Sequence, residues 1–215
     1  MSAPAELALG LLLAAARAVP AADAGIRAGR FQEGIPAGMT LAGKTLGIVG
    51  LGRLGVCMAR YGHALGMTVL AWSENLTPET ALAAGAERVT KEELFARSDA
   101  ISVHLVLSAR SRHIIGAREL GRMKPGAILI NTSRGPLIEE DALVAALQEG
   151  RIFAGLDVFD REPLRPDDRM RKLPNTVLTP HVGYCVAETM GHFYAQSVEN
   201  ALAFLNGTPI RIANP

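Results

Sequence analysis

The chain has 215 residues, 49% of them hydrophobic and 20% charged, which is typical of a folded globular protein. Its formal net charge of +1 gives no general attraction to nucleic acid or to acidic membranes, so we expect neither as a partner. The two cysteines, Cys57 and Cys185, lack any metal-ligand or disulfide spacing. We therefore expect no metal site and a reducing, cytoplasmic location.

The chain begins with the apolar stretch "AELALGLLLAAARAV", residues 5–19, which predicts a helix. Its apolar core of about ten residues is too short to span a bilayer. Glu6 stands where a secretion signal would carry basic residues. A helix that is apolar on much of its circumference is rarely left in water, so we expect a homodimer in which it packs on the partner. The apolar positions are Leu7, Leu9, Leu11, Leu12 and Leu13.

Short apolar runs then alternate with amphipathic segments. The runs predict strands at residues 45–49, 68–72, 100–104, 127–131, 152–158 and 176–179. The segments predict helices at residues 54–65, 78–84, 91–96, 117–123, 140–148 and 188–205. Such alternation indicates an α/β fold, a doubly wound parallel sheet with helices on both faces. We expect residues 1–40 to form the first helix and a turn-rich connector, 41–183 the sheet domain, and 184–215 a closing helix.

A glycine-rich loop follows the first predicted strand. It reads Gly50-x-Gly52-x-x-Gly55 and leads into an amphipathic segment. In this context Gly50 permits a tight turn, Gly52 lets the backbone approach a pyrophosphate, and Gly55 allows close packing of helix on strand. Backbone N–H groups at the helix start would face the phosphates. The loop therefore predicts a Rossmann-type dinucleotide-binding domain.

The end of the second predicted strand leaves the choice of cofactor open. An acid is expected there, about 20 residues after the loop, to bind the adenosine ribose hydroxyls. The chain has Ser73, with Glu74 beside it. A missing acid removes repulsion toward a ribose 2′-phosphate, yet no arginine follows at once to bind one. NAD and NADP both remain candidates, and Ser73 could equally be a neutral strand-end residue with Glu74 facing solvent.

Three polar residues follow the last three predicted strands: Arg134, Glu162 and His181. Alone, each could be an ordinary surface residue. Ligands of an open parallel sheet bind beyond the carboxyl ends of its strands, where all three would emerge beside the glycine loop. A histidine beside a carboxylate keeps its proton and suits a general acid, and an arginine can hold a substrate carboxylate. With a hydride from a nicotinamide, these groups could reduce a ketone.

The chain resembles the D-isomer-specific 2-hydroxyacid dehydrogenase family. The resemblance is carried by "GIVGLGRLG", "VHLVLS", "MKPGAILINTSRGPLIEEDALVAAL", "GLDVFDREPL" and "LPNTVLTPHVGY". It implies that Arg134 binds and polarises the substrate, that His181 is the acid/base, and that Glu162 tunes His181. Glu162 also argues against formate dehydrogenases, which carry an amide there. The implied cofactor contacts are Arg53 and Leu54 at the loop, Ser73, the backbone near Leu105 and Thr132, and Asp157 to the carboxamide.

The chain departs from the family pattern in four ways. Ser73 replaces the usual ribose-binding aspartate, "VHLVL" lacks a common proline, and "GRIFAGLDV" is one residue shorter, which could shift Asp157 or Glu162. Roughly the first hundred residues of a family member have no counterpart, so most of an N-terminal substrate domain is absent. Residues 1–40 then resemble the interdomain and dimerisation helix, and residues 184–215 the helix that returns toward that domain.

Two functions of different classes follow. The first is the cofactor-binding half of an oxidoreductase that transfers a hydride between NAD(P)H and a 2-keto acid to give a D-2-hydroxy acid. The second is a non-catalytic dinucleotide-binding module that dimerises or senses redox state. Arg134, Glu162 and His181 favour the first. The particular acid is not predicted, because much of the selectivity should come from the absent region.

Overall fold

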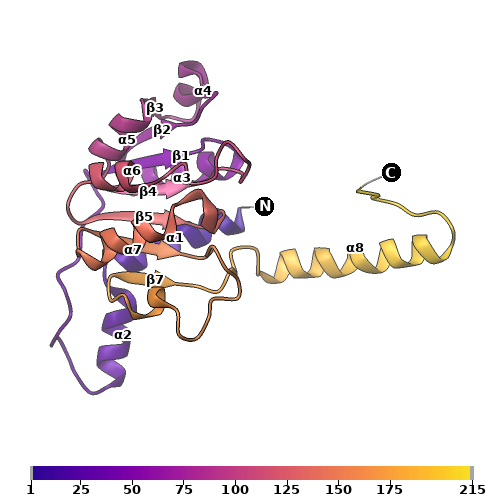
Figure 1. Ribbon diagram of the computed structural model, residues 1–215. Coiled ribbons are helices and arrows are strands. Elements are labelled where there is room, and N and C mark those ends of the chain that lie inside the picture. The colour runs from indigo at the N-terminus through magenta and orange to yellow at the C-terminus, as the bar shows by residue number, and fades with distance from the viewer. Residues whose placement is uncertain (1, 214–215) are drawn as a thin grey trace.

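A computed structural model describes residues 2–213 and contains a seven-stranded sheet whose strands all run parallel. The strand order is β3-β2-β1-β4-β5-β6-β7, so the order reverses between β1 and β4 (Figure 1). The strands are β1 Thr45–Val49, β2 Thr68–Trp72, β3 Glu87–Arg88, β4 Ala100–Val103, β5 Ala127–Asn131, β6 Ile152–Leu156 and β7 Thr176–Leu178. This is the doubly wound α/β fold that the alternating pattern predicts.

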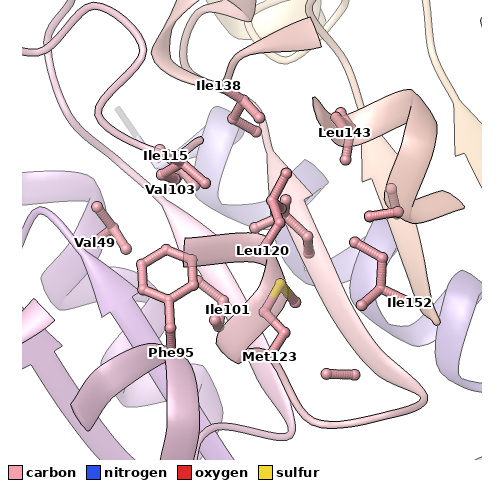
Figure 2. Packing of buried hydrophobic residues seen from close by; sticks show 14 of the residues in the cluster. Val49, Phe95, Ile101, Val103, Ile115, Leu120, Met123, Ile138, Leu143 and Ile152 are labelled. Carbon is pink, nitrogen blue, oxygen red and sulfur yellow. The ribbon is translucent and has the colours of Figure 1, made fainter. Parts of the chain in front are cut away.

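Helices cover both faces of the sheet, and each face has its own buried cluster. One cluster joins α5, α6 and α7 to the sheet, and the other joins α1 and α3 to it. Figure 2 shows the first cluster, where Phe95 of α5 lies close to Val49 and Ile101 of the sheet. The helices are α1 Ala3–Ala16, α2 Val19–Arg27, α3 Arg53–Ala64, α4 Pro78–Ala83, α5 Lys91–Arg97, α6 Ala117–Arg122, α7 Glu140–Gln148 and α8 Ala187–Leu205.

The N-terminal helix packs on its own chain. α1 contacts α3, β5, β6 and β7, and Leu11 and Leu12 are 2% and 0% exposed. This contact accounts for most of the apolar face that led us to expect a partner, although Leu13 stays 37% exposed. The homodimer therefore stays a prediction, with less support from α1 than the sequence suggested.

Among residues 2–213, no single helix is long and apolar enough to cross a bilayer. Only α1 and α2 taken together reach that length and apolarity, and they are bent by 64° relative to each other. The bend comes where Ala18, the N-cap of α2, adopts a left-handed φ of 49° and Pro20 stands in the first turn of α2. The sequence reading missed α2, because Pro20 interrupts a run that looked like one helix.

The last helix stands apart from the sheet. α8 projects away from the body of the molecule (Figure 1) and buries only Thr189. Its exposed apolar side chains are Phe193, Tyr194, Val198, Leu202, Phe204 and Leu205, which are 45–78% exposed.

Candidate active site

Every loop that carries a predicted site residue leaves the same edge of the sheet, because all strands are parallel. The glycine loop follows β1, and the segment with His104 and Leu105 follows its neighbour β4. These two loops flank the point where the strand order reverses. Ligands of open α/β sheets bind at such a point.

The glycine loop has the geometry that a pyrophosphate needs. Gly50 has a φ of 99°, and a Cβ there would lie 2.8 Å from the backbone of His104. A Cβ on Gly55 would overlap the carbonyl oxygen of Gly50, so only glycine lets α3 start this close to β1. Around Gly52 a Cβ would meet nothing within 4 Å. Gly52 is also the N-cap of α3 and has no side-chain cap, which leaves the first N–H groups of the helix open to an anion.

A cleft of about 750 Å³ extends from this loop across the ends of β2 and β4. Its apolar wall consists of Trp72, Leu105 and Ile114. Ser73, which the resemblance implies as a cofactor contact, lines the same cleft, and so does Glu74, which is exposed. Arg53 and Leu54 form the first turn of α3 next to Gly52.

His104, which the sequence reading did not single out, also lines this cleft. Its Nε2 pairs with the Ser102 hydroxyl at 2.8 Å, whereas its Nδ1 is fully buried and has no hydrogen-bond partner within residues 2–213. Burial lowers the pKa of His104 to about 4, so the ring is neutral at pH 7.

The loop after β5 presents Arg134. Asn131, at the end of β5, accepts a hydrogen bond from the Ser133 amide at 3.0 Å and donates one to the Arg134 carbonyl at 2.9 Å. The Ser133 hydroxyl donates to the carbonyl oxygen of Val103. A Cβ on Gly135 would overlap the backbone of Phe159, so this loop and the next one pack directly on each other. The guanidinium of Arg134 is exposed, and its Nη1 donates to the Ser133 carbonyl oxygen at 2.6 Å.

Glu162 and His181 form a hydrogen-bonded pair. Nδ1 of His181 lies 2.6 Å from Oε2 of Glu162, and the other oxygen of Glu162 accepts from the Phe159 amide at 2.9 Å. Burial opposes ionisation of Glu162, but these hydrogen bonds and the charges of His181 and Arg134 lower its pKa overall. Both side chains are about one-third exposed, at 35% for His181 and 34% for Glu162.

Asp157 fixes the segment that carries His181. Its carboxylate accepts hydrogen bonds from the Thr179 hydroxyl at 2.6 Å, from the Val182 amide at 2.9 Å and from the Gly183 amide at 2.8 Å. These donors lie on both sides of His181, whose φ of 56° is in the left-handed region. Because a carboxylate offers about four acceptor positions, Asp157 keeps room for one more donor. The short "GRIFAGLDV" stretch leaves Asp157 directly after β6.

A second cavity, of about 420 Å³, brings four of the predicted residues together: Thr132, Arg134, Asp157 and His181. The Thr132 hydroxyl is buried without a hydrogen-bond partner among residues 2–213. Glu162 does not line this cavity; with His181 it lines a neighbouring one of about 590 Å³. Tyr184 and Phe193 complete the wall, and the ring of Tyr184 meets that of His181 edge-on at 6.1 Å.

These residues fit a dinucleotide. The open N-terminus of α3 suits the pyrophosphate, the apolar wall of the first cleft suits a base, and the unpartnered Thr132 hydroxyl awaits a polar ligand in the second cavity. Fold and site together define a dinucleotide-binding α/β domain with a hydrogen-bonded histidine–glutamate pair and an arginine beside the binding cleft.

Comparison with known proteins identifies the family. The family model of the D-isomer specific 2-hydroxyacid dehydrogenase NAD binding domain matches residues 9–183, and the chain belongs to this family. Glyoxylate reductase of Thermococcus litoralis is 43% identical over an alignment of 213 positions, which covers 95% of this chain and 64% of that protein. Hydroxypyruvate reductase of Thermotoga maritima is 40% identical in an alignment that covers 92% of this chain and 65% of that protein.

A solved structure agrees with these sequences. Phosphoglycerate oxidoreductase from Vibrio cholerae superposes with a TM-score of 0.91 at 37% identity, over 95% of this chain and 67% of that one. The chain thus spans about two thirds of the length of the relatives it matches.

Several residues of the two cavities escaped the sequence reading: Pro4, His104, Ser108, Arg110, Ser111, Tyr184 and Phe193. For His104 a signal was present, because it directly follows an apolar strand in the way that Ser73 does. Pro4 and Phe193 gave none, since they reach the site from helices at opposite ends of the chain.

Proposed function

We propose that this chain is the cofactor-binding part of an oxidoreductase that interconverts a 2-keto acid and a D-2-hydroxy acid with NAD(H) or NADP(H). One observation carries the proposal. The Glu162–His181 pair, joined at 2.6 Å, presents His181 to a cavity that Arg134 also lines, next to a cleft built for a dinucleotide. A solvent-facing ion pair without function would have no reason to lie there.

The residues divide the chemistry between them. A bound nicotinamide cofactor exchanges a hydride with the substrate carbon. Arg134 pairs with the substrate carboxylate through its guanidinium and polarises the carbonyl. His181 uses Nδ1 to bind Glu162, so its Nε2 donates a proton to the carbonyl oxygen during reduction and removes one from the hydroxyl during oxidation. Glu162 stays ionised because its pKa is lowered, and its Oε2 holds the His181 ring in place through the hydrogen bond to Nδ1.

The cofactor contacts follow the two cavities. Gly50, Gly52 and Gly55, with Arg53 and Leu54 in the first turn of α3, hold the pyrophosphate. Ser73 and Leu105 hold the adenosine. In the second cavity Thr132 and Asp157 bind the carboxamide of the nicotinamide, Asp157 with the acceptor position that its three internal hydrogen bonds leave free.

The relatives are longer, and the exposed apolar residues of α8 are the surface on which we expect a substrate-binding domain to pack. A homodimer and a cytoplasmic location complete the proposal; the free thiols Cys57 and Cys185 accord with a reducing compartment. Light scattering at micromolar concentration tests the dimer, and a monomeric mass would refute it.

Titration with NADH and NADPH tests the core of the proposal. We expect the chain to bind a reduced cofactor and its melting temperature to rise, since a ligand at about 100 times its Kd stabilises the folded state by about 2.7 kcal/mol. A folded sample that binds neither cofactor at millimolar concentration would sink the proposal. Tight binding combined with no turnover, even in a chain extended by a substrate domain, would instead favour a non-catalytic module.

A further inference from the structure

The mouth of the first cleft lies between two loops that flank the glycine loop. Ser73, Glu74 and Asn75 come from the loop after β2, and Ser108, Arg110 and Ser111 from the loop after β4. Since β2 and β4 are the two neighbours of β1 in the sheet, these loops face each other across the glycine loop. A side chain on one can therefore share a ligand with a side chain on the other.

The turn that carries Arg110 is fixed, but its guanidinium has no partner within residues 2–213. Its turn is fixed by Ser111, whose hydroxyl donates to the Val106 carbonyl at 2.7 Å and accepts from the Ser108 amide at 2.8 Å. A further backbone bond joins the Arg112 amide to the Ser108 carbonyl at 3.0 Å. Within residues 2–213, however, the guanidinium of Arg110 makes no hydrogen bond or ion pair, unlike that of Arg97, which binds Glu87 with both terminal nitrogens.

Ser73 is likewise unengaged: within the described chain its hydroxyl forms no hydrogen bond. It stands at the strand-end position whose usual carboxylate would bind the ribose hydroxyls and repel a phosphate. The mouth of the cleft therefore combines an unpaired guanidinium, carried on a fixed turn, with a neutral hydroxyl.

We propose that Arg110 and Ser73 together bind the 2′-phosphate of the adenosine ribose, so that this chain takes NADP(H). A guanidinium presents a planar fork of donors that matches a phosphate, and the serine hydroxyl adds a donor from the opposite loop. The sequence reading looked for the arginine directly after Ser73, whereas the structure supplies it from the loop after β4. Glu74 is the carboxylate that opposes the site, and its exposure lets it turn into solvent.

The assignment rests on the proposed function, so its test separates the phosphate from the rest of the cofactor. The probes are adenosine 2′,5′-bisphosphate against 5′-AMP, and NADPH against NADH, all titrated into the full 215-residue chain. The variants are Arg110→Ala and Ser73→Asp. Arg112→Ala is the matched control, because Arg112 belongs to the same turn and is exposed but does not line the cleft.

We expect Arg110→Ala to weaken the binding of adenosine 2′,5′-bisphosphate and of NADPH by about tenfold or more, which corresponds to about 1.4 kcal/mol of binding free energy. It should change the Kd of 5′-AMP and of NADH by no more than about twofold. Arg112→Ala should change the Kd of all four ligands by no more than about twofold. Ser73→Asp should lower the affinity for the 2′-phosphorylated ligands and leave the affinity for NADH unchanged or raise it. Added salt should reduce the wild-type preference for the bisphosphate, because the contact is between charges near the surface.

Four results would overturn the assignment. Arg110→Ala could behave like Arg112→Ala, or could weaken NADH and NADPH equally. The wild type could bind NADH and reject NADPH, which would assign the ribose hydroxyls to Glu74 and leave the proposed function standing. Binding of neither cofactor would refute the proposed function and this assignment together.

Discussion

The loops after β1, β2 and β4 hold their polar groups differently from the loops after β5, β6 and β7. In the first set the helix N-terminus, the guanidinium of Arg110 and the hydroxyl of Ser73 have no partner within the described chain. In the second set Asn131 forms two hydrogen bonds within its own loop, Asp157 forms three to the loop after β7, and Glu162 forms one within its own loop and one to His181. The first set leaves its polar groups for a ligand to satisfy.

The second set fixes its reacting groups before a ligand arrives. Rigid placement of an acid/base and an arginine is what catalysis needs, because positioning accounts for much of an enzyme's rate. Open backbone donors are what reversible cofactor binding needs. On the proposed function, recognition of the adenosine and pyrophosphate lies on the side of β2, and the chemistry lies on the side of β7.

The largest expected effect concerns turnover. His181 and Glu162 are fixed but about one-third exposed, so water reaches the site. We expect the 215-residue chain alone to reduce glyoxylate, pyruvate or hydroxypyruvate about 1,000-fold or more slowly than a chimera that adds the N-terminal segment of a relative. The reason is that correct orientation of the reactants can remove about 7–11 kcal/mol of the activation barrier. NAD(P)H oxidation measures this. A turnover number near about 10 per second for the chain alone, lost in His181→Ala, would contradict it.

The glycine loop offers a matched pair that separates folding from binding. A Cβ at position 55 overlaps the Gly50 carbonyl, so Gly55→Ala should cost about 1–3 kcal/mol of folding free energy, whereas Gly52→Ala meets nothing within 4 Å and should leave the melting temperature unchanged. Gly52→Ala should nevertheless weaken cofactor binding by about tenfold or more, because the pyrophosphate lies against that backbone. Thermal melts and cofactor titrations on both variants give the answer. Equal stability losses in the two would show that this account of the loop is wrong.

A variant at Asp157 tests whether the loops after β5, β6 and β7 are fixed independently of the loops after β1, β2 and β4. Asp157→Asn places an amide donor opposite the Val182 or Gly183 N–H, so we expect a loss of about 1–3 kcal/mol in unfolding free energy. Affinity for 5′-AMP, which binds only the first cleft, should stay within about twofold. Chemical denaturation and a 5′-AMP titration measure the two effects. A parallel loss of 5′-AMP affinity would mean that the two sets of loops are coupled.

The residues that followed from sequence are those whose role is set by their position along a strand. Gly50, Arg134 and His181 directly or closely follow β1, β5 and β7, and parallel strands bring such positions to one edge whatever the details of packing. Apart from α1, which ends at Ala16 rather than at residue 19, the predicted strands and helices end within two residues of the observed limits; the strands end early because their last predicted residues lie in the site loops.

The parts that sequence did not predict depend on tertiary contacts. β3 has only two residues, both exposed, so no apolar run marks it. The role of Asp157 in holding the His181 segment arises from hydrogen bonds across 22 or more positions of the chain. Arg110 joins Ser73 in one cleft only because β2 and β4 flank β1. Such pairings follow from the sheet order rather than from local spacing.

The smallest expected effect concerns the pH dependence of stability through His104. Burial lowers its pKa to about 4 in the folded protein, against about 6.5 in the unfolded chain, so the unfolded state binds the extra proton between these values. The contribution of His104 to the free energy of unfolding is therefore fully present above pH 6.5 and decreases as the pH falls toward 4. Between pH 7 and 5.5 the loss should be about 1 kcal/mol. His104→Gln, whose amide can still reach Ser102, should remove that part of the slope, whereas His192→Gln on exposed α8 should keep it. Urea unfolding at a series of pH values measures the slope, and identical slopes for wild type and His104→Gln would show that His104 takes up its proton without a cost to the fold.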